Sequence, residues 1–219
     1  MIVFDLDDTL YLERDFAFSG YTHLDQLVQS ETGVAGFGAR CRALFEAGER
    51  RTIFDLARRA LGLDAADIAI QTLIDAYRNH PPDITLCPDA ADFLEQNPQP
   101  FGLITDGPAH MQRNKIAALG LPRWIEHLRP TGAWGEGYGK PHPRAFIEME
   151  QIAGTADHMV YIADNPAKDF VTPKTRGWTT VQVTRVGGVH DPAPKDEAHA
   201  ADIVVPSLHD FSLWVNARQ

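Results

Sequence analysis

Two carboxylates near the beginning of the chain have a spacing that could support chemistry. Asp5 and Asp7 lie two residues apart in the segment FDLDDTL, directly after the apolar residues 2–4. In a loop that leaves a buried strand, this spacing lets both carboxylates converge on one small volume. Two acids at one site can divide the work, because one can attack a substrate or hold a metal ion while the other donates a proton. The segment therefore predicts an acid pair with two roles.

The same segment also has a structural interpretation. An Asp-rich turn in which Asp8 or Thr9 caps the following helix would contain the same residues without any chemistry. A calcium-binding loop is a poorer third interpretation, because it would need glycine where the chain has Leu10 and glutamate where it has Phe16. On this segment alone, the acid pair and the capping turn both stay open.

A second apolar run ends in polar residues in the segment GLITDG. Ile104 is followed by Thr105, Asp106 and Gly107, and Pro108 then marks the expected start of a helix. The Thr105 hydroxyl and the main-chain amides around Gly107 could face an anion at that helix N-terminus. Asp-Gly-Pro is also an ordinary turn sequence, so this segment by itself leaves both interpretations open.

Two later segments contribute a lysine and another acid pair. Lys140 lies between turn-forming residues in GYGKPHP, where a lone lysine would ordinarily be a solvated surface charge. In MVYIADNPAKDF, an apolar strand ends at Asp164, and Asp169 follows five residues later. Carboxylates in this arrangement suit a hard cation such as magnesium, which takes a few carboxylates plus water and substrate oxygens. A metal site and a purely structural acidic turn are both open here.

Short apolar strands alternating with helices must position these residues. MIVFDLDD is predicted to be a short buried strand that ends abruptly in carboxylates. Further strands are predicted at PFGLITDG, HMVYIADN, WTTVQVTR and ADIVVPSL, with helices near residues 109–119, 143–152 and 207–217. This alternation is typical of βαβ units and a parallel sheet, whose strands deliver their carboxyl-terminal residues to one edge.

The segment between the first strand and Pro81-Pro82 follows a different pattern. HLDQLVQS, ARCRALFEAGE, TIFDLARRALGL and ADIAIQTLIDAY all place apolar residues three and four apart, which predicts helices throughout. We therefore expect a catalytic core formed by residues 1–12 and 84–219, with a helical cap of residues 13–83 inserted after the first strand. The expected hinges lie near residues 11–15 and 82–85, and closure of the cap would exclude water from the site.

Composition narrows the classes of partner. The 219 residues are 44% hydrophobic and 23% charged, as in ordinary globular proteins. A net charge of −10 opposes binding to nucleic acid. No signal peptide is readable, no apolar run approaches the roughly 20 residues that span a bilayer, and Cys41 and Cys87 form neither a disulfide framework nor a zinc motif. We expect a cytoplasmic monomer or homodimer that acts on a small molecule, with no membrane partner.

Taken together in chain order, the four segments resemble the haloacid dehalogenase superfamily, in its phosphatase-type form. The motifs of that superfamily are matched by Asp5, Asp7 and Thr9 (DxDxT), by Thr105, by Lys140, and by the acidic pair Asp164 and Asp169. The resemblance covers the whole chain. It implies the α/β class, with a Rossmann-like, doubly wound parallel sheet and an all-helical cap inserted after the first motif.

The resemblance implies a role for each residue that it matches. Asp5 would attack phosphorus and form an aspartyl phosphate, while Asp7 would protonate the leaving oxygen and later activate water. Phosphoryl oxygens would be bound at Thr105, Asp106 and Lys140. Asp106 departs from the family pattern, which often has asparagine or another small polar residue after the threonine, so its role is open.

The resemblance also implies a magnesium ion. The metal ligands would be Asp5, Asp164 and the main-chain carbonyl of Asp7, with Asp169 binding directly or through water. Positive charge from the metal would offset the approach of an anionic nucleophile to an anionic ester. Pro173 should shorten the helix that follows Asp169.

The predicted function is thus magnesium-dependent hydrolysis of a small-molecule phosphate monoester. A dehalogenase would use the same aspartate on carbon, but it needs neither Asp7 nor a metal. A phosphomutase differs only in its acceptor, and a non-catalytic binding protein would be expected to have lost the nucleophile or the general acid. Sugar phosphates and nucleoside monophosphates are the leading substrate classes. Conceivable contacts in the expected cap are Arg14, Tyr21, His23, Arg40, Arg42, Arg50 and Arg51.

Overall fold

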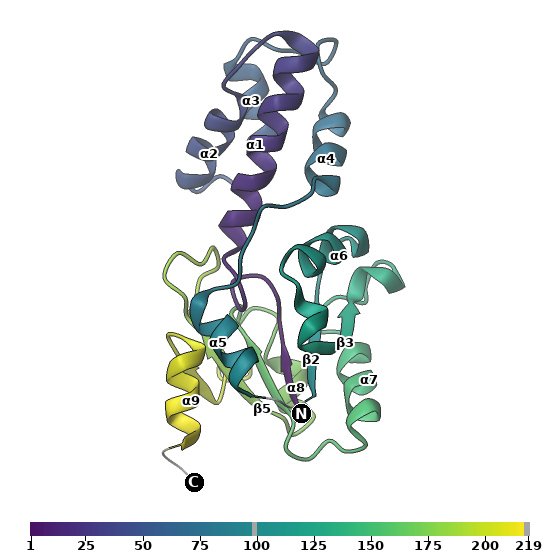
Figure 1. Cartoon of the computed structure of the whole chain (residues 1–219), viewed down its shortest axis with the longest axis vertical. Coiled ribbons are helices and arrows are strands. Elements are labelled where there is room, and N and C mark those ends of the chain that lie inside the picture. The colour runs from purple at the N-terminus through teal and green to yellow at the C-terminus, as the bar shows by residue number, and fades with distance from the viewer. Residues whose placement is uncertain (98–99, 217–219) are drawn as a thin grey trace. The chain divides into compact units, whose positions relative to one another are not determined.

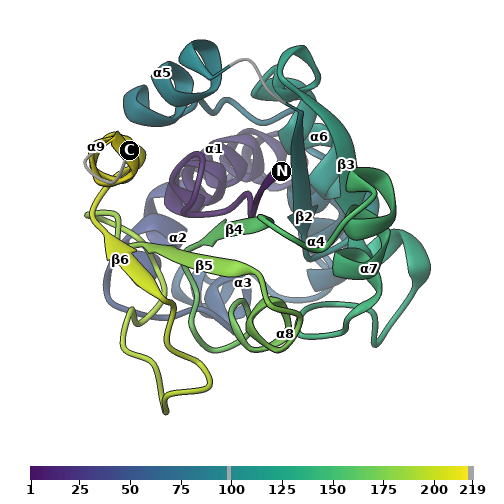
Figure 2. The same cartoon turned by 90° about the horizontal axis from the view of Figure 1, so that it is seen from below.

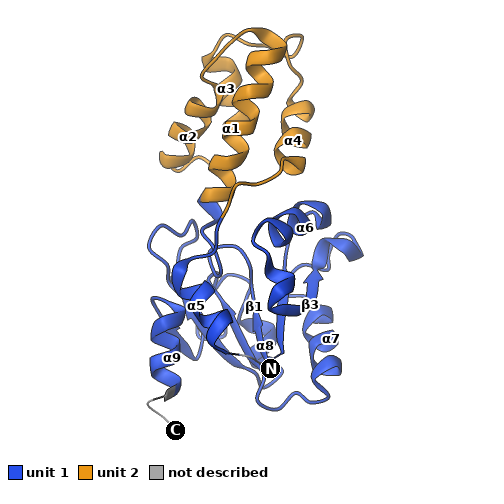
Figure 3. Ribbon diagram, viewed as in Figure 1, with its two compact units in different colours: residues 1–14, 85–219 blue, residues 15–84 orange. Residues whose placement is uncertain are grey.

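The chain divides into two compact units (Figure 3). The computed structural model describes residues 1–97 and 100–216. One unit contains residues 1–14 and the described part of 85–219, and the other contains residues 15–84. The first unit has strands and helices, whereas the second has helices only. Among the helices that the structure describes, none combines the length and apolar character that crossing a bilayer requires.

A six-stranded parallel sheet forms the centre of the first unit (Figures 1 and 2). The strands are β1 (Ile2–Phe4), β2 (Phe101–Thr105), β3 (Ile125–Pro130), β4 (Val160–Ala163), β5 (Thr179–Val183) and β6 (Ile203–Val205). Their order is β3-β2-β1-β4-β5-β6. The chain therefore winds outward from β1 to β3, returns beside β1 as β4, and winds outward again. This is the doubly wound Rossmann-like topology that the sequence predicts.

The register of the sheet brings the polar strand ends together. Phe4 of β1 lies opposite Leu103 of β2 on one side and Ile162 of β4 on the other. Asp5 follows β1 directly, and Asp164 follows β4 directly. Since all three strands run in parallel, the side chains that follow them gather at one edge, where the reversal of winding leaves room for a ligand.

The helices of the first unit pack on both faces of the sheet. They are α5 (Pro88–Gln96), α6 (Ala109–Ala118), α7 (Arg144–Ala153), α8 (Val171–Thr175) and α9 (Leu208–Asn216), with 3-10 turns η1 (Leu121–Arg123) and η2 (Thr131–Trp134). On one face, Val3 and Tyr161 of the sheet share a buried cluster with Phe146 and Met149 of α7. Gly102 of β2 permits this close packing, because a Cβ there would lie 2.8 Å from the Met149 sulfur.

Aromatic side chains form the core on the opposite face. The ring of Phe93 in α5 packs against Phe4 and Phe101 of the sheet, with ring centroids 6.0 and 6.2 Å apart. The same ring contacts Phe211 of α9 at 6.1 Å, so α5 and α9 cover this face together. Burial of these large rings supplies much of the hydrophobic stabilisation of the unit.

Two elements of the first unit were not predicted by the sequence. The edge strand β3 reads IEHLRP, and because only its first residue is buried it lacks the apolar run of the inner strands. Helix α5 buries Ala90, Phe93 and Leu94 at helical spacing, but it has only nine residues and begins at Pro88. The last helix ends at Asn216 as described, and the predicted Ala217 lies outside the described residues. Pro173 lies in the first turn of α8, which has only five residues.

The second unit is built from four helices: α1 (Glu13–Thr32), whose first two residues belong to the first unit, α2 (Phe37–Glu46), α3 (Ile53–Ala60) and α4 (Ile70–Asn79). Each of the four segments predicted to be helical between residues 13 and 80 overlaps one of these helices. Gly38 lets α2 approach α1 closely, because a Cβ there would lie 2.5 Å from the carbonyl oxygen of Tyr21. The Ser19 hydroxyl accepts a hydrogen bond from the Asp83 amide at 2.8 Å, which ties the two ends of the unit together.

Candidate active site

Asp5 lies at the centre of a buried group of charges. Its main-chain amide donates to the carbonyl oxygen of Ile162 at 2.8 Å, so the β1–β4 ladder continues one residue beyond the strand and fixes the backbone of Asp5. The side chain is 3% exposed, and its Oδ1 lies 2.8 Å from the Nζ of Lys140. Burial opposes the charge of this carboxyl, but the attraction of Lys140 and Lys168 outweighs burial and lowers the pKa of Asp5. Asp5 is therefore ionised at neutral pH.

Lys140 joins Asp5 to the acidic loop after β4. Its Nζ lies 2.8 Å from Asp5 Oδ1 and 2.7 Å from Asp169 Oδ1, and it donates to the Tyr161 hydroxyl at 2.9 Å. The side chain is fully buried, which excludes the interpretation of Lys140 as a solvated surface charge. Burial alone would discharge the amine, but the neighbouring Asp169 and Asp5 raise the pKa of Lys140 above its ordinary value. The ammonium group stays charged.

Three carboxylates form a possible metal site. Asp5, Asp164 and Asp169 each offer a carboxylate oxygen, and these oxygens lie within 4.8 Å of one another. Burial, followed by the charges of Asp5 and Asp169, raises the pKa of Asp164 to about 9. Burial also raises the pKa of Asp169, although Lys140 opposes the shift. These shifts mean that the cluster carries more negative charge than its surroundings balance. The donor set therefore fits a hard divalent cation such as Mg²⁺.

The total charge of the buried acids and lysines also favours a divalent cation. The connected acids and lysines of the site are Asp5, Asp106, Asp164, Asp169, Lys140 and Lys168. Four carboxylates and two ammonium groups carry a net charge of −2 when all are ionised. One divalent cation would neutralise this group.

Asp7 lies in a separate set of contacts beside this cluster. Its Oδ1 accepts hydrogen bonds from the Nζ of Lys115 at 2.7 Å and from the Tyr11 hydroxyl. Lys115 is buried, whereas the side chain of Asp7 is 20% exposed. Both of these contacts are made to Oδ1, and the partial exposure of the side chain leaves Asp7 accessible to a ligand.

Thr105 and Asp106 belong to a third network. The Thr105 hydroxyl donates to Oε1 of Gln112 at 3.2 Å, and Nε2 of Gln112 donates to the carbonyl oxygen of Asp106 at 2.7 Å. Oδ1 of Asp106 accepts hydrogen bonds from the Thr131 hydroxyl at 2.7 Å and from the amide of Lys140 at 3.1 Å. The carboxylate of Asp106 thus fixes the backbone from which Lys140 projects.

Lys168 is a second cation at the site that the sequence did not single out. Its Nζ lies 3.4 Å from Oδ2 of Asp106, 3.9 Å from Oδ1 of Asp169 and 4.0 Å from Oδ2 of Asp5. Its side chain is 29% exposed, in contrast to Lys140. Burial and the charge of Lys140 disfavour its ammonium form, but Asp169, Asp5 and Asp106 raise the pKa of Lys168 above its ordinary value.

Asp8 has the capping role that was the structural alternative for this segment. Its Oδ1 accepts a hydrogen bond from the amide of Glu13, the first residue of α1, at 2.8 Å. Its Oδ2 accepts another from the amide of Val189 at 2.7 Å. Burial raises the pKa of Asp8 to about 6. The segment therefore contains both a helix cap and the acid pair, on different residues.

Some of the missed residues had a readable signal. Gln112, Lys115 and Ile116 are the buried positions of α6, and their spacing of three and four places two polar residues on a core-facing surface. Polar side chains in such positions require partners, which here are Thr105 and Asp7. Lys168 directly precedes Asp169, an expected metal ligand. Its position in the sequence does not indicate whether its side chain points toward the site.

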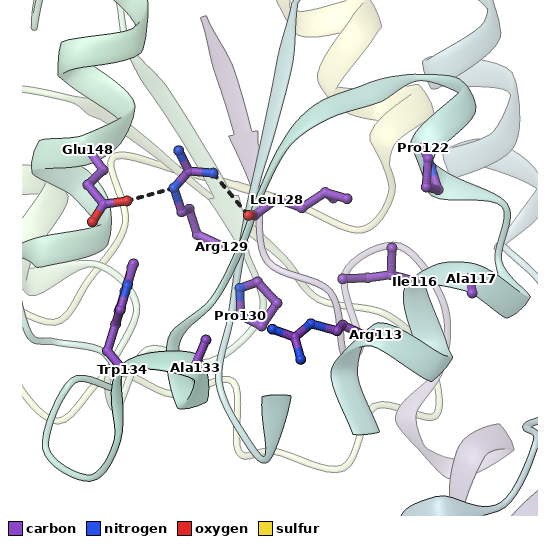
Figure 4. Close-up of a pocket in the computed structure, with 10 residues that line it drawn as sticks. All are labelled: Arg113, Ile116, Ala117, Pro122, Leu128, Arg129, Pro130, Ala133, Trp134 and Glu148. Carbon is purple, nitrogen blue, oxygen red and sulfur yellow. Dashed lines mark hydrogen bonds and ion pairs between the residues drawn. The ribbon is translucent and has the colours of Figure 1, made fainter. Parts of the chain in front are cut away.

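The structure also contains cavities that are lined by none of the residues of the charged cluster. One, of about 460 Å³, lies in the first unit and is lined by Arg113, Arg129, Trp134 and Glu148 among others (Figure 4). Arg129 binds Glu148 there at 2.7 Å. None of the residues predicted for chemistry lines this cavity.

Another cavity, of about 300 Å³, lies in the helical unit and is lined in part by Tyr21, Arg50 and Arg51. These are three of the conceivable substrate contacts. A fourth, Arg42, instead packs over the ring of Phe18 at 4.0 Å.

Comparison with known proteins shows which family models the chain matches. A model of haloacid dehalogenase-like hydrolases matches residues 1–171, and a model of HAD-hydrolase-like proteins matches residues 137–211. No curated protein matches significantly.

Solved structures extend the likeness to nearly the whole chain. An L-2-haloacid dehalogenase from Xanthobacter autotrophicus has 22% identity and a TM-score of 0.63, covering 99% of this chain and 98% of its own. The putative HAD-hydrolase YfnB from Bacillus subtilis, described as bound to magnesium, has 16% identity and a TM-score of 0.69, covering 98% and 97%. A haloacid dehalogenase-like protein of unknown function from Agrobacterium tumefaciens has 17% identity and a TM-score of 0.61, covering 99% and 97%. At these identities the likeness shows the fold.

Proposed function

Since the chain belongs to the family of haloacid dehalogenase-like hydrolases, we propose that it is a magnesium-dependent phosphatase that acts on a small-molecule phosphate monoester. The observation that carries the proposal is the cluster of Asp5, Asp164 and Asp169, whose carboxylate oxygens lie within 4.8 Å of one another. A nucleophile that is also part of a divalent-cation site suits a reaction at an anionic phosphoryl group.

The acid at Asp7 and the possible cation site at Asp164 both argue against chemistry at a carbon–halogen bond. Halide leaves as a stable anion and requires no proton, so that reaction has no use for an acid at Asp7. It also develops no charge on a phosphoryl group, so a cation site at Asp164 would be superfluous. The names of several structural neighbours include L-2-haloacid dehalogenase, but their low identity extends only to the fold.

Asp5 would carry out the first step. Its lowered pKa keeps it ionised, and Lys140 holds its Oδ1 at 2.8 Å. A carboxylate oxygen of Asp5 forms a bond to phosphorus as the bond from phosphorus to the ester oxygen breaks. The products are an aspartyl phosphate and the leaving alcohol. Fixed positioning and charge neutralisation supply most of the catalysis in such transfers.

Asp7 would handle the proton in both halves of the reaction. In the first half, its carboxyl group gives a proton to the departing ester oxygen. In the second, its carboxylate takes a proton from the water that attacks phosphorus, which releases inorganic phosphate and restores Asp5. Lys115 and Tyr11 hold Oδ1 of Asp7, so Oδ2 is the oxygen that would exchange the proton.

Magnesium would be held by Asp5, Asp164 and Asp169, with the main-chain carbonyl of Asp7 as a further proposed ligand. When bound, it supplies positive charge that lowers the repulsion between an anionic nucleophile and an anionic ester. Thr105 is proposed as a contact for the phosphoryl group. The helical unit is proposed as a lid that admits small substrates such as sugar phosphates or nucleoside monophosphates.

The test is turnover of an activated aryl phosphate with Mg²⁺ and with excess chelator, beside 2-chloropropionate as a halogenated substrate. We expect magnesium-dependent release of phosphate and no release of chloride. Chloride release, or full phosphatase activity in chelator, would reject the proposal. Transfer of the phosphoryl group to a second sugar hydroxyl rather than water would identify a phosphomutase.

Variants of the acid pair test the two roles separately. Asp5→Asn should abolish turnover and the covalent intermediate. Asp7→Asn should lower turnover by about 10² to 10⁴ but still accumulate phosphorylated protein, detectable by intact mass. Asp191→Asn, which removes an exposed carboxylate outside the cluster, is the control and should retain wild-type activity. A phosphoryl mass on the Asp5→Asn protein would show that the nucleophile is wrongly assigned.

A further inference from the structure

The cavity of about 460 Å³ in the first unit lies at the edge of the sheet (Figure 4). Residues 128–130 of the edge strand β3 line its middle. Helix α6 lines it on one side of β3 with Arg113, Ile116 and Ala117, and α7 lines it on the other side with Glu148. Its volume is within the range of about 300–1,000 Å³ that is typical of small-molecule sites.

The lining of this cavity is chemically uneven. Apart from Arg113, Arg129 and Glu148, the side chains that line it are apolar, and they include the indole ring of Trp134. A mostly apolar wall with a few polar groups is the usual composition of a site for an organic ligand. The apolar part would hold the body of such a ligand, and the polar groups would fix its orientation.

The charges around the cavity favour an anion. Glu148 is bound by Arg129 at 2.7 Å and by Arg144 at 3.3 Å. Arg113 is exposed and makes no ion pair with any residue that the structure describes. Three guanidinium groups and one carboxylate give this group a net charge of +2, although the whole chain carries −10. An acidic group on a ligand would therefore be attracted here.

Two of the lining groups are already held in place. Arg129 donates to Glu148 through Nε at 2.7 Å and to the Leu128 carbonyl through Nη1 at 3.0 Å. A guanidinium group has five N–H donors, so Arg129 keeps donors beyond these two, and its side chain is 28% exposed. The guanidinium of Arg144 lies 4.5 Å from the centre of the Trp134 ring, which restricts the indole. Groups that are fixed beforehand lose little freedom when a ligand binds.

We propose that this cavity is a binding site for a small organic anion with a flat apolar body. The acidic group of the ligand pairs with Arg113 and Arg129, and its body lies against Trp134 and the apolar wall. The site goes beyond the proposed hydrolytic function and does not depend on it, because no residue of the charged cluster lines the cavity.

Calorimetric titration of the full chain with 2-naphthoate, an aromatic carboxylate, tests the proposal. Two matched compounds separate its parts: 2-naphthamide has the same body without the charge, and acetate has the carboxylate without the body. We expect 2-naphthoate to bind with an affinity at least about fivefold higher than 2-naphthamide, the upper end of the range for an exposed charge pair. Acetate should not compete with it.

Variants of α6 locate the bound naphthoate. Ala117→Phe places a ring in the cavity and should abolish binding. Ala118→Phe is its matched control, because Ala118 is an exposed neighbour in α6 that does not line the cavity, and it should bind like the wild type. Arg113→Met should weaken binding of 2-naphthoate about fivefold but leave 2-naphthamide unchanged. Lys195→Met removes one exposed positive charge elsewhere and should have no effect.

Several results would overturn the proposal. They are a wild type that does not bind 2-naphthoate, equal affinities for 2-naphthoate and 2-naphthamide, competition by acetate, and wild-type binding in Ala117→Phe and Arg113→Met. Sedimentation velocity gives a further check. A dimer of the wild type that Ala117→Phe dissociates would mean that a second copy of the chain covers this cavity instead of a small ligand.

Discussion

Binding of Mg²⁺ should displace a proton from the acidic cluster. Burial and the charges of Asp5 and Asp169 raise the pKa of Asp164 to about 9. At pH 7, two units lower, only about 1% of this carboxyl is ionised. A metal ligand must be deprotonated, so the bound ion and the proton compete. The apparent affinity for Mg²⁺ should therefore rise about tenfold per pH unit just above pH 7, and roughly 50-fold by pH 9, where half of the carboxyl is ionised.

Calorimetry in two buffers of different ionisation enthalpy measures this competition. At pH 7, each Mg²⁺ bound should release at least one proton to the buffer, and the release should decline as the pH approaches 9. Asp164→Asn removes the titrating group, so the remaining affinity should be weak and its pH dependence shallower. Wild-type affinity that stays constant between pH 7 and 9, with no proton released, would refute the charge argument for the metal site.

The raised pKa of Asp164 also makes the stability of the folded protein depend on pH. A carboxyl whose pKa is about 9 in the folded protein and 3.8 ordinarily binds a proton more tightly when folded. Its contribution without metal is therefore greatest below pH 3.8 and is lost as the pH rises toward 9. Magnesium favours the ionised form, so the increase in Tm that it causes should be larger at pH 8 than at pH 6.

Further predictions concern the core and the choice of metal. Asp89→Asn should lower the free energy of unfolding at pH 7 by about 1–3 kcal/mol, because Asp89 binds Arg185 and the Leu208 amide at 2.8 and 2.7 Å. Burial opposes the charge of Asp89, but the ion pair with Arg185 outweighs burial and lowers its pKa. In urea titrations, the difference in unfolding free energy between wild type and Asp89→Asn should therefore vanish as the pH falls below that lowered pKa. Equal stability of the two proteins at pH 7 would contradict this prediction. Gly102→Val should destabilise by about 1–3 kcal/mol, since the new side chain would collide with Met149; an unchanged urea midpoint would disprove the clash. Calcium should inhibit magnesium-dependent turnover, because its larger and looser coordination spoils in-line geometry; activation by Ca²⁺ would count against that reasoning.

The parts of the site that lie at strand ends could be predicted from the sequence. Asp5 and Asp164 each follow an apolar run, and parallel strands bring such residues to one edge whatever the details of packing. The same logic fails for β3, because an edge strand needs no continuous apolar run to pair on one side. It also fails for Lys168, because the position of its ammonium group depends on the direction of a long side chain in a loop.

The residues of α6 that contact the site could be predicted only in part. Lys115 occupies a core-facing position of α6, so the sequence could indicate that it needs a buried acidic partner. It could not indicate Asp7, which is 108 residues away along the chain. That pairing depends on how α6 packs beside the loop after β1, and packing of this kind follows from the whole set of side-chain shapes rather than from any periodicity.

The charge of the site also bears on how an acidic protein attracts an anionic substrate. The chain carries a net charge of −10, but exposed charges are screened over about 8 Å at physiological ionic strength. Buried charges are screened much less, so the local balance around Asp5 decides whether a phosphate ester can enter. Without a metal, this group of acids and lysines is at most neutral and, when fully ionised, negative. We therefore expect a divalent cation to bind before the ester, so that an incoming phosphoryl group meets no excess negative charge.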